Sequence, residues 1–184
     1  MRQILKIVDK SDLLRIKDDY FKKLEERRFK ILVCSGAGCI SSNCHAVKDA
    51  LIECLEGHGL TDKVLIIETG CIGTCDLGPV MTVTALDGRE ESKRTAGKQA
   101  DGDAIVSNKG VFYTMLTPQD IPAIVESHLI DGKIKTDKTY FDRNLDRNIP
   151  YIEDIDYFKN QTKIALDNCG RIDYGSMEEY IAND

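Results

Sequence analysis

Short runs of β-branched and aliphatic residues alternate with segments of helical periodicity over the first 132 residues. The β-rich runs at residues 29–33, 63–68, 79–84 and 111–116 predict four strands. Apolar residues at helical spacing predict one helix between the first two strands and another after the fourth. The order is strand–helix–strand and then strand–strand–helix, which predicts an α/β fold for residues 29–132.

Residues 1–28 predict a helix that precedes this core. Ser11 is placed to cap it, and its apolar residues form one broad stripe opposite a charged face. The stripe must pack, either against the domain at residues 29–132 or against a partner subunit. We expect packing against this domain.

The character of the sequence changes after Gly132. Residues 133–150 are polar and charged and predict an extended linker. A helix is predicted over residues 156–168 and a shorter one from Ser176. Their apolar faces have no core behind them, so residues 133–184 are predicted to be a linker and helical docking arm. The alternative is that this arm folds back onto the sheet or the N-terminal helix.

A polar segment separates the third and fourth predicted strands. Residues 87–109 contain several glycines and few large apolar side chains. They predict an inserted hairpin loop, because the entropy of loop closure grows only slowly with length. We favour a mobile surface loop, and a docking role is the alternative.

Composition narrows the class of protein. The net charge of −6 argues against a nucleic-acid partner, which would require a basic surface. Seven cysteines are an odd number and show no secreted disulfide framework. Charge interrupts the N-terminus too early for a signal peptide, and no apolar stretch is long enough to span a membrane. We therefore expect a cytoplasmic location.

Four of the cysteines lie in two short loops, each directly after a predicted strand. The first cysteine loop, residues 34–39, has Cys34 and Cys39 at Cys-x4-Cys spacing, and the second, residues 70–79, has Cys71 and Cys75 at Cys-x3-Cys spacing. If the two strands are parallel, a right-handed crossover places both loops at the same edge of the sheet. The four thiolates are then predicted to form a metal site.

The surroundings of these cysteines favour one kind of metal centre. Four thiolates suit either zinc or an iron–sulfur cluster. The loops also contain Gly36, Gly38, Gly70, Gly73 and Gly78, which let main-chain N–H groups approach an anionic centre closely. A helix expected to start at Ser41 or Ser42 would point its positive end at the same place. We favour a [2Fe–2S] cluster, with structural zinc or a reactive-thiol or disulfide site as alternatives.

The other cysteines and two histidines are not predicted to be ligands. Cys54 and His128 lie on apolar helix faces and are interpreted as packing residues. Cys169 is far from the other cysteines in the sequence. Cys44 follows the first loop and could approach the centre without binding it. His45 is not needed as a ligand because four cysteines are already in place.

These motifs resemble those of thioredoxin-like [2Fe–2S] ferredoxins. The resemblance is carried by the Cys-x4-Cys loop, by TGCIGTCDLGP at residues 69–79 and by VFY at residues 111–113. It is most specific to the version fused to the N-terminus of the flavin- and NAD-binding subunit of electron-bifurcating [FeFe]-hydrogenases. Related modules occur in NAD-linked formate dehydrogenases and respiratory NADH dehydrogenase. Residues 161–173 and 178–182 are similar to the segment that leads into the flavin domain of those subunits.

The resemblance implies a fold, a site and a function. The fold is thioredoxin-like, with an N-terminal helix and a C-terminal helical extension, and Cys34, Cys39, Cys71 and Cys75 are the implied cluster ligands. The implied function is one-electron transfer within an NAD(P)H-linked oxidoreductase complex. The implied partners are a flavin- and NAD(P)-binding subunit or domain and other iron–sulfur subunits.

Two features limit what this resemblance implies. The sequence has no Gly-x-Gly-x-x-Gly loop and no independent active site, so FMN binding, NADH binding and catalysis are not expected of this chain alone. The insertion at residues 87–109 is longer than the family hairpin. The alternative function is a thioredoxin-like interaction or assembly module in which the four cysteines hold structural zinc.

Overall fold

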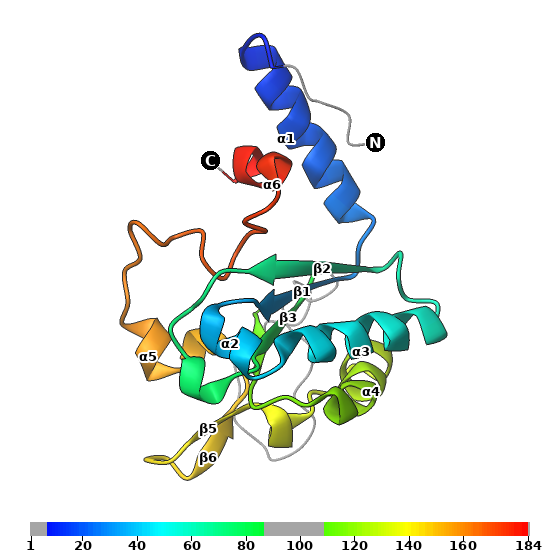
Figure 1. The fold of residues 1–184 in the computed structure, drawn as a ribbon. Coiled ribbons are helices and arrows are strands. Elements are labelled where there is room, and N and C mark those ends of the chain that lie inside the picture. Colours follow the sequence, from blue (N-terminus) through cyan, green and yellow to red (C-terminus); the bar gives the residue numbers. More distant parts are fainter. Residues whose placement is uncertain (1–6, 87–108, 184) are drawn as a thin grey trace, which may run out of the picture.

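A four-stranded sheet with the strand order β2-β1-β3-β4 forms the centre of the molecule (Figure 1). The computed structural model describes residues 7–86 and 109–183. β1 (Phe29–Cys34) is parallel to β2 (Val64–Thr69) and antiparallel to β3 (Met81–Ala85), which is antiparallel to β4 (Val111–Tyr113). This is the α/β order of strands and helices predicted from the sequence. The predicted insertion at residues 87–109 lies outside the described residues except for Lys109.

Two helical segments cover one face of the sheet and enclose the main core (Figure 1). They are α3 (Cys44–Gly57) and α4 (Ile121–Ile124), which continues as a π-helical turn over Val125–Ile130. The inward side chains of the strands and helices form a single apolar cluster that includes Ile31, Val33, Leu51, Leu55, Val83, Ile121 and Leu129. The packing of this cluster fixes α3, and therefore the segment between β1 and β2, relative to the sheet.

A glycine turn ends α3. Gly59 adopts a left-handed conformation with φ +65°, and Leu60 N donates to Leu55 O at 2.9 Å. The start of α3 differs from the prediction, because the helix begins at Cys44 after a left-handed Asn43. A separate short helix, α2 (Ala37–Ser41), occupies the region where the start was expected.

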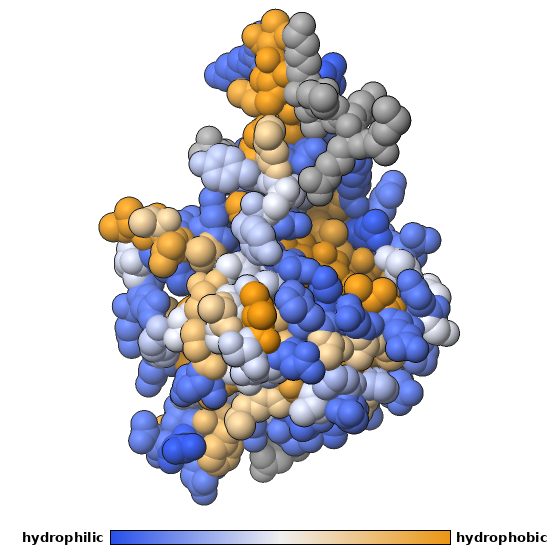
Figure 2. All heavy atoms as spheres, in the orientation of Figure 1, coloured by the Kyte–Doolittle hydropathy of each residue, from blue (hydrophilic) through white to orange (hydrophobic). Residues whose placement is uncertain are grey.

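The N-terminal helix α1 (Lys10–Glu25) is present, but Ser11 is not its cap. Asp9 accepts from Ser11 N at 2.8 Å and from Asp12 N at 3.2 Å, because its backbone is extended and its carboxylate reaches the first turn. Ile16 is the buried residue of the helix, and α1 packs against α6 (Met177–Ala182). Figure 2 shows apolar side chains gathered along the projecting end of α1.

The prediction of an extended linker at residues 133–150 is wrong. This segment contains the hairpin of β5 (Tyr140–Asp142) and β6 (Arg147–Ile149), and it lies along the edge of β4. Phe112 N donates to Pro150 O at 2.8 Å, and Thr114 N donates to Lys138 O at 3.0 Å. The backbone donors of β4 would otherwise lack partners, and the main chain of the hairpin region supplies them.

The helix predicted over residues 156–168 is much shorter in the structure. α5 (Asp156–Lys159) ends after four residues. Ile164 is 88% exposed and Leu166 61% exposed, so no tertiary packing supports a longer helix. The predicted start at Ser176 is confirmed, since its hydroxyl accepts from Glu179 N at 3.1 Å at the start of α6. Among the described residues, no helix is long and apolar enough to cross a membrane.

His128 is a packing residue, as predicted. It is fully buried, its Nδ1 lies 2.8 Å from the Tyr113 hydroxyl, and its ring packs edge-on against Phe29. Burial lowers its pKa to about 4, because a charged imidazolium would be poorly solvated there.

This burial predicts a pH dependence of folding stability. Between pH 6.5, the usual histidine value, and pH 4, the unfolded chain binds a proton at His128 that the folded chain excludes. The free energy of unfolding should therefore fall by about 3 kcal/mol as the pH decreases through this window. Above the window, the full contribution of neutral His128 to stability is present. Urea unfolding at several pH values measures this. His128→Phe should remove the dependence, and His58→Gln, at an exposed position, should retain it.

The contacts of residues 133–184 predict that this segment is needed for stability. A chain ended at Gly132 loses the acceptors for Phe112 N and Thr114 N and exposes the surface that buries Ile149 and Ile155. Burial of these two isoleucines alone contributes about 3–6 kcal/mol. Thermal unfolding should show a much lower midpoint for this chain. A chain that ends at Lys159 keeps these contacts, so its thermal midpoint should fall far less. If the chain that ends at Gly132 were as stable as the full chain, the stabilising role of residues 133–159 would be contradicted.

Candidate metal centre

The two cysteine loops meet at the carboxyl end of the parallel pair β1 and β2. Cys34 is the last residue of β1 and pairs with Thr69, the last residue of β2. Ser35 N donates to Thr69 O at 2.9 Å, which extends the pairing into the loops. Cys39 lies on α2, and Cys75 begins the short 3-10 helix η1 (Cys75–Leu77). The predicted convergence of the loops at one sheet edge is therefore confirmed.

Glycines of the first loop touch cysteines of the second. A Cβ atom on Gly36 would lie 2.7 Å from Cys71 Cβ, and one on Gly38 would lie 2.8 Å from Cys75 Cβ. These distances are shorter than real side chains allow, so only glycine permits this approach. The absence of a side chain at each glycine brings one loop against the other.

The remaining glycines of the second loop have different roles. A Cβ on Gly78 would lie 3.0 Å from Cys39 Sγ, which makes the contact between the loops reciprocal. Gly73 adopts φ +96°, a conformation that favours glycine, and its N–H donates to Cys71 Sγ at 3.4 Å. A Cβ on Gly70 would meet Cys169 Sγ at 3.4 Å.

The four thiols form one buried pair and one exposed pair. Cys34 and Cys39 are 4% and 2% exposed, whereas Cys71 and Cys75 are at the surface. The sulfurs of Cys71 and Cys75 are 3.5 Å apart. Two thiolates that bind one tetrahedral metal at about 2.3 Å lie about 3.8 Å apart, so this pair fits one metal ion.

The four thiols can hold either one metal ion or two. A single zinc ion would require all four sulfurs around one point. Two pairs on opposing loops can instead provide two thiolates to each of two bridged metal ions.

The surroundings of three of the cysteines favour the protonated thiol. Burial raises the pKa of Cys39 to about 12, and neighbouring Cys34 adds to this effect. Burial and then Cys34 also raise the pKa of Cys44. A hydrogen bond with Cys71 raises the pKa of Cys75. Metal binding must therefore displace protons, and the positive charge of the metal stabilises the thiolates.

The second loop offers a further donor. The hydroxyl of Thr74 is buried, and it has no hydrogen-bond partner among the described residues. It lies in the sequence between the two exposed cysteines. A buried polar group without a partner is rare in folded proteins, and a hydroxyl donor at this position suits a negatively charged, sulfur-rich centre.

The other cysteines are distributed as follows. Cys54 packs against the main core, as predicted. Cys44 is buried in the same apolar cluster as Cys34 and Cys39. Its sequence position just after the first loop therefore correctly indicated that it lies close to the site. Cys169 lies beside Gly70 of the second loop, which its sequence position did not indicate. His45 is exposed.

An ion pair next to the first loop was missed by the sequence analysis. Glu68 pairs with Lys48 of α3 and accepts from Ser35 Oγ at 3.1 Å. The hydrogen bond from Lys48 lowers the pKa of Glu68. This contact joins α3, β2 and the start of the first loop. It depends on tertiary structure, because the charges are twenty residues apart in the sequence.

Comparison with known proteins finds similarity in sequence and in structure. No protein-family model matches the chain. Over 96 residues, which are 52% of this chain and 72% of the relative, the chain is 27% identical to a 2Fe-2S ferredoxin of Clostridium pasteurianum. The wild-type thioredoxin-like [2Fe-2S] ferredoxin of Aquifex aeolicus is 23% identical with a TM-score of 0.41, over 59% of this chain and 92% of that chain. A second structure of a thioredoxin-like [2Fe-2S] ferredoxin from the same organism is 23% identical with a TM-score of 0.42, over 59% of this chain and 86% of that chain.

The predicted resemblance to 2Fe-2S ferredoxins is thus confirmed in part. The finer resemblance, to subunits of bifurcating hydrogenases and NADH dehydrogenases, stays a prediction.

The contact between the loops predicts the effect of added methyl groups. Gly36→Ala and Gly38→Ala push the second loop away from the first, and each should cost about 1–3 kcal/mol of unfolding free energy. Both should also reduce the amount of metal bound per chain. Gly57→Ala is the control, because nothing lies within 4 Å of its added Cβ. Equal metal content in all three variants would show that the loops can separate without loss of the site.

Proposed function

We propose that this chain is a one-electron carrier that holds a [2Fe–2S] cluster on Cys34, Cys39, Cys71 and Cys75. The observation that carries the proposal is the contact of two glycine-containing loops, each with one pair of cysteines. The likeness to a 2Fe-2S ferredoxin over 96 residues supports the same cofactor. Structural zinc is the weaker alternative, because the relative over these residues is a 2Fe-2S ferredoxin.

The cluster, when bound, accepts and releases one electron. The chain's own residues would set its surroundings. Cys34 and Cys39 would hold one side in the apolar interior, where charge is poorly solvated. Cys71 and Cys75 would hold the other side at the surface, which gives a partner protein a short path for the electron. The Gly73 N–H and the Thr74 hydroxyl are available as donors to sulfur.

We further propose that the carrier works as a module or subunit of an NAD(P)H-linked oxidoreductase complex in the cytoplasm. The support is the sequence resemblance to bifurcating hydrogenase and NADH dehydrogenase subunits, which includes residues 161–173 and 178–182. The partners would be a flavin- and NAD(P)-binding subunit or domain and other iron–sulfur subunits. We assign the docking role to the exposed apolar side chains of α1 and α6, because such patches often mark partner surfaces. They are Leu13, Leu14, Phe21, Met177 and Tyr180.

Electron transfer from NADH tests the proposed complex. In the presence of a flavin-containing subunit, NADH should bleach the visible absorption of the cluster, and Phe21→Glu on α1 should slow this reaction by weakening association. Ile52→Glu, on the exposed side of α3, is the matched control for an added charge. If dithionite reduces the cluster but NADH with the subunit never does, the proposed complex is wrong and the carrier function remains.

Substitution of the cysteines tests the ligand assignment. Serine at any of the four proposed ligands should abolish or distort the visible spectrum of the purified protein, because oxygen is a poorer ligand for this iron than thiolate sulfur. Serine at Cys54 or Cys169 should leave the spectrum unchanged. A normal spectrum for Cys71→Ser would contradict the assignment. A colourless wild-type protein that contains zinc would support the assembly module instead.

A further inference from the structure

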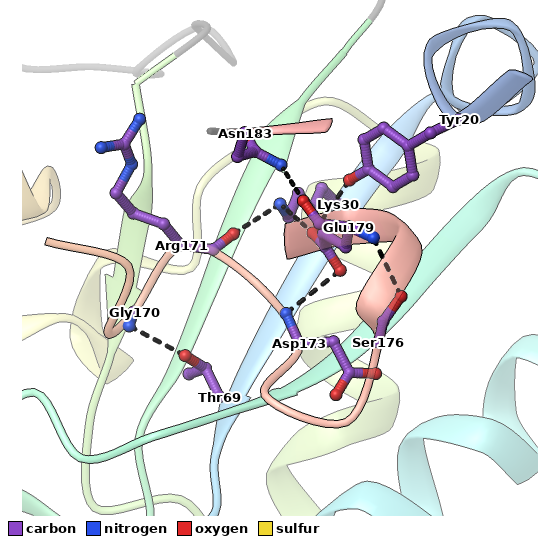
Figure 3. Close-up of polar contacts among 9 residues, drawn as sticks. All are labelled: Tyr20, Lys30, Thr69, Gly170, Arg171, Asp173, Ser176, Glu179 and Asn183. Atoms are coloured by element: carbon purple, nitrogen blue, oxygen red, sulfur yellow. Dashed lines mark hydrogen bonds and ion pairs between the residues drawn. The ribbon is translucent and has the colours of Figure 1, made fainter. Parts of the chain in front are cut away.

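The C-terminal segment of the chain reaches back to the second cysteine loop. Gly170 N donates to Thr69 Oγ1 at 2.8 Å, one residue before Gly70 (Figure 3). Gly170 has φ +80°, and a Cβ there would lie 2.6 Å from the Cγ2 atom of Ile72. Cys169 Sγ also lies against Gly70. We call residues 160–183 the C-terminal strap.

The strap is held at its far end by one buried carboxylate. Glu179 of α6 is 3% exposed. Its Oε1 accepts from Tyr20 Oη at 2.9 Å and from Lys30 Nζ at 3.0 Å, and its Oε2 accepts from Asp173 N at 3.1 Å (Figure 3). Burial and then the hydrogen bond to Glu179 raise the pKa of Tyr20, so its hydroxyl remains a donor at neutral pH.

Lys30 connects this carboxylate to the sheet. It lies on β1, four residues before Cys34, and its Nζ also donates to Arg171 O at 2.6 Å. One ammonium group therefore binds both the side chain of Glu179 and the main chain of the strap next to Gly170. A buried carboxylate is stable only when paired, so these contacts form and break together.

Apart from the packing of α6 against α1, few apolar contacts hold the strap. Ile172 and Ala182 are buried, but most of its other side chains, including Ile164 and Leu166, are exposed. Segments with few buried apolar contacts open locally at lower free energy than the core. Loss of the Glu179 contacts should therefore release the strap while the sheet stays folded.

We propose that Glu179 is a positioning residue that, through Lys30 and Asp173, holds the strap against Gly70 and Ile72 of the second cysteine loop and so limits solvent access to the metal centre on that side. This inference rests on the proposed function, because the consequence of the contact is control over how exposed the cluster is to solvent. Reduction adds negative charge to a cluster that is already anionic, so a more polar environment favours the reduced form. Release of the strap should therefore raise the reduction potential and speed the loss of iron to a chelator.

Two neighbouring glutamates provide a matched test in the full chain. Glu179→Gln removes the buried charge, whereas Glu178→Gln removes the same charge at an exposed position. Iron removal by bathophenanthroline disulfonate should be at least about tenfold faster for Glu179→Gln, because breaking one partner of a buried ion pair is strongly destabilising. Its reduction potential should be more positive. Glu178→Gln should match the wild type in both measurements.

A second variant and a double variant separate positioning from simple loss of folding. Gly170→Ala disturbs the contact with Ile72 without altering the ion pair, and it should shift both measurements in the same direction. Lys30→Met combined with Glu179→Gln removes both charges, and it should recover part of the wild-type behaviour.

Hydrogen exchange gives a readout that does not need the cluster. In Glu179→Gln, amides of the strap and of residues 69–72 should exchange faster, while those of β1 and β3 stay protected. Exchange that rises equally across the sheet would make Glu179 a residue of the folding core and overturn the proposal. Identical behaviour of the Glu179 and Glu178 variants would also overturn it. Absence of iron and sulfide from the wild-type protein would instead count against the proposed function.

Discussion

The close approach of two glycine-containing loops at the end of β1 and β2 determines the geometry of the metal centre. Gly36 and Gly38 lie directly against Cys71 and Cys75, at distances that no other residue permits. The parallel pairing of the strands brings the loops to one edge, and the packing of α3 on the sheet fixes the crossover between them. The core therefore serves the site by holding two backbone segments in contact.

The position of the site at the sheet edge gives it two different sides. One pair of thiols lies in an apolar cluster with Val80 and Phe112, and the other pair faces solvent. An electron carrier requires both properties, because a protected interior limits side reactions and an exposed edge admits a partner. The C-terminal strap contacts the loop that carries the exposed pair, through Thr69 and Gly70.

Local sequence patterns were sufficient for the sheet and for the meeting of the two cysteine loops at its edge. The β-rich runs and the two cysteine loops are each encoded within a few neighbouring residues, and the structure places them as expected. The cap of α1 was misplaced because Asp9 and Ser11 are both good capping residues, and only the backbone conformation decides between them.

The structure of residues 133–184 could not be predicted in the same way. Residues 133–150 are polar, yet their main-chain groups pair with β4. Such a main-chain contact does not require a particular pattern of side chains, so the sequence does not indicate it. Lys30 and Glu179 are 149 residues apart, and each alone resembles an ordinary surface charge. Cys169 lies beside the second loop where the chain turns at Gly170, whose N–H donates to Thr69 Oγ1.

The metal content of the purified chain tests the central claim most directly. Analysis of iron, acid-labile sulfide and zinc should give two irons and two sulfides per chain, with an electron paramagnetic resonance signal from one unpaired electron after reduction, as four thiolates around a [2Fe–2S] cluster require. One zinc per chain, with neither iron nor sulfide, would contradict the account.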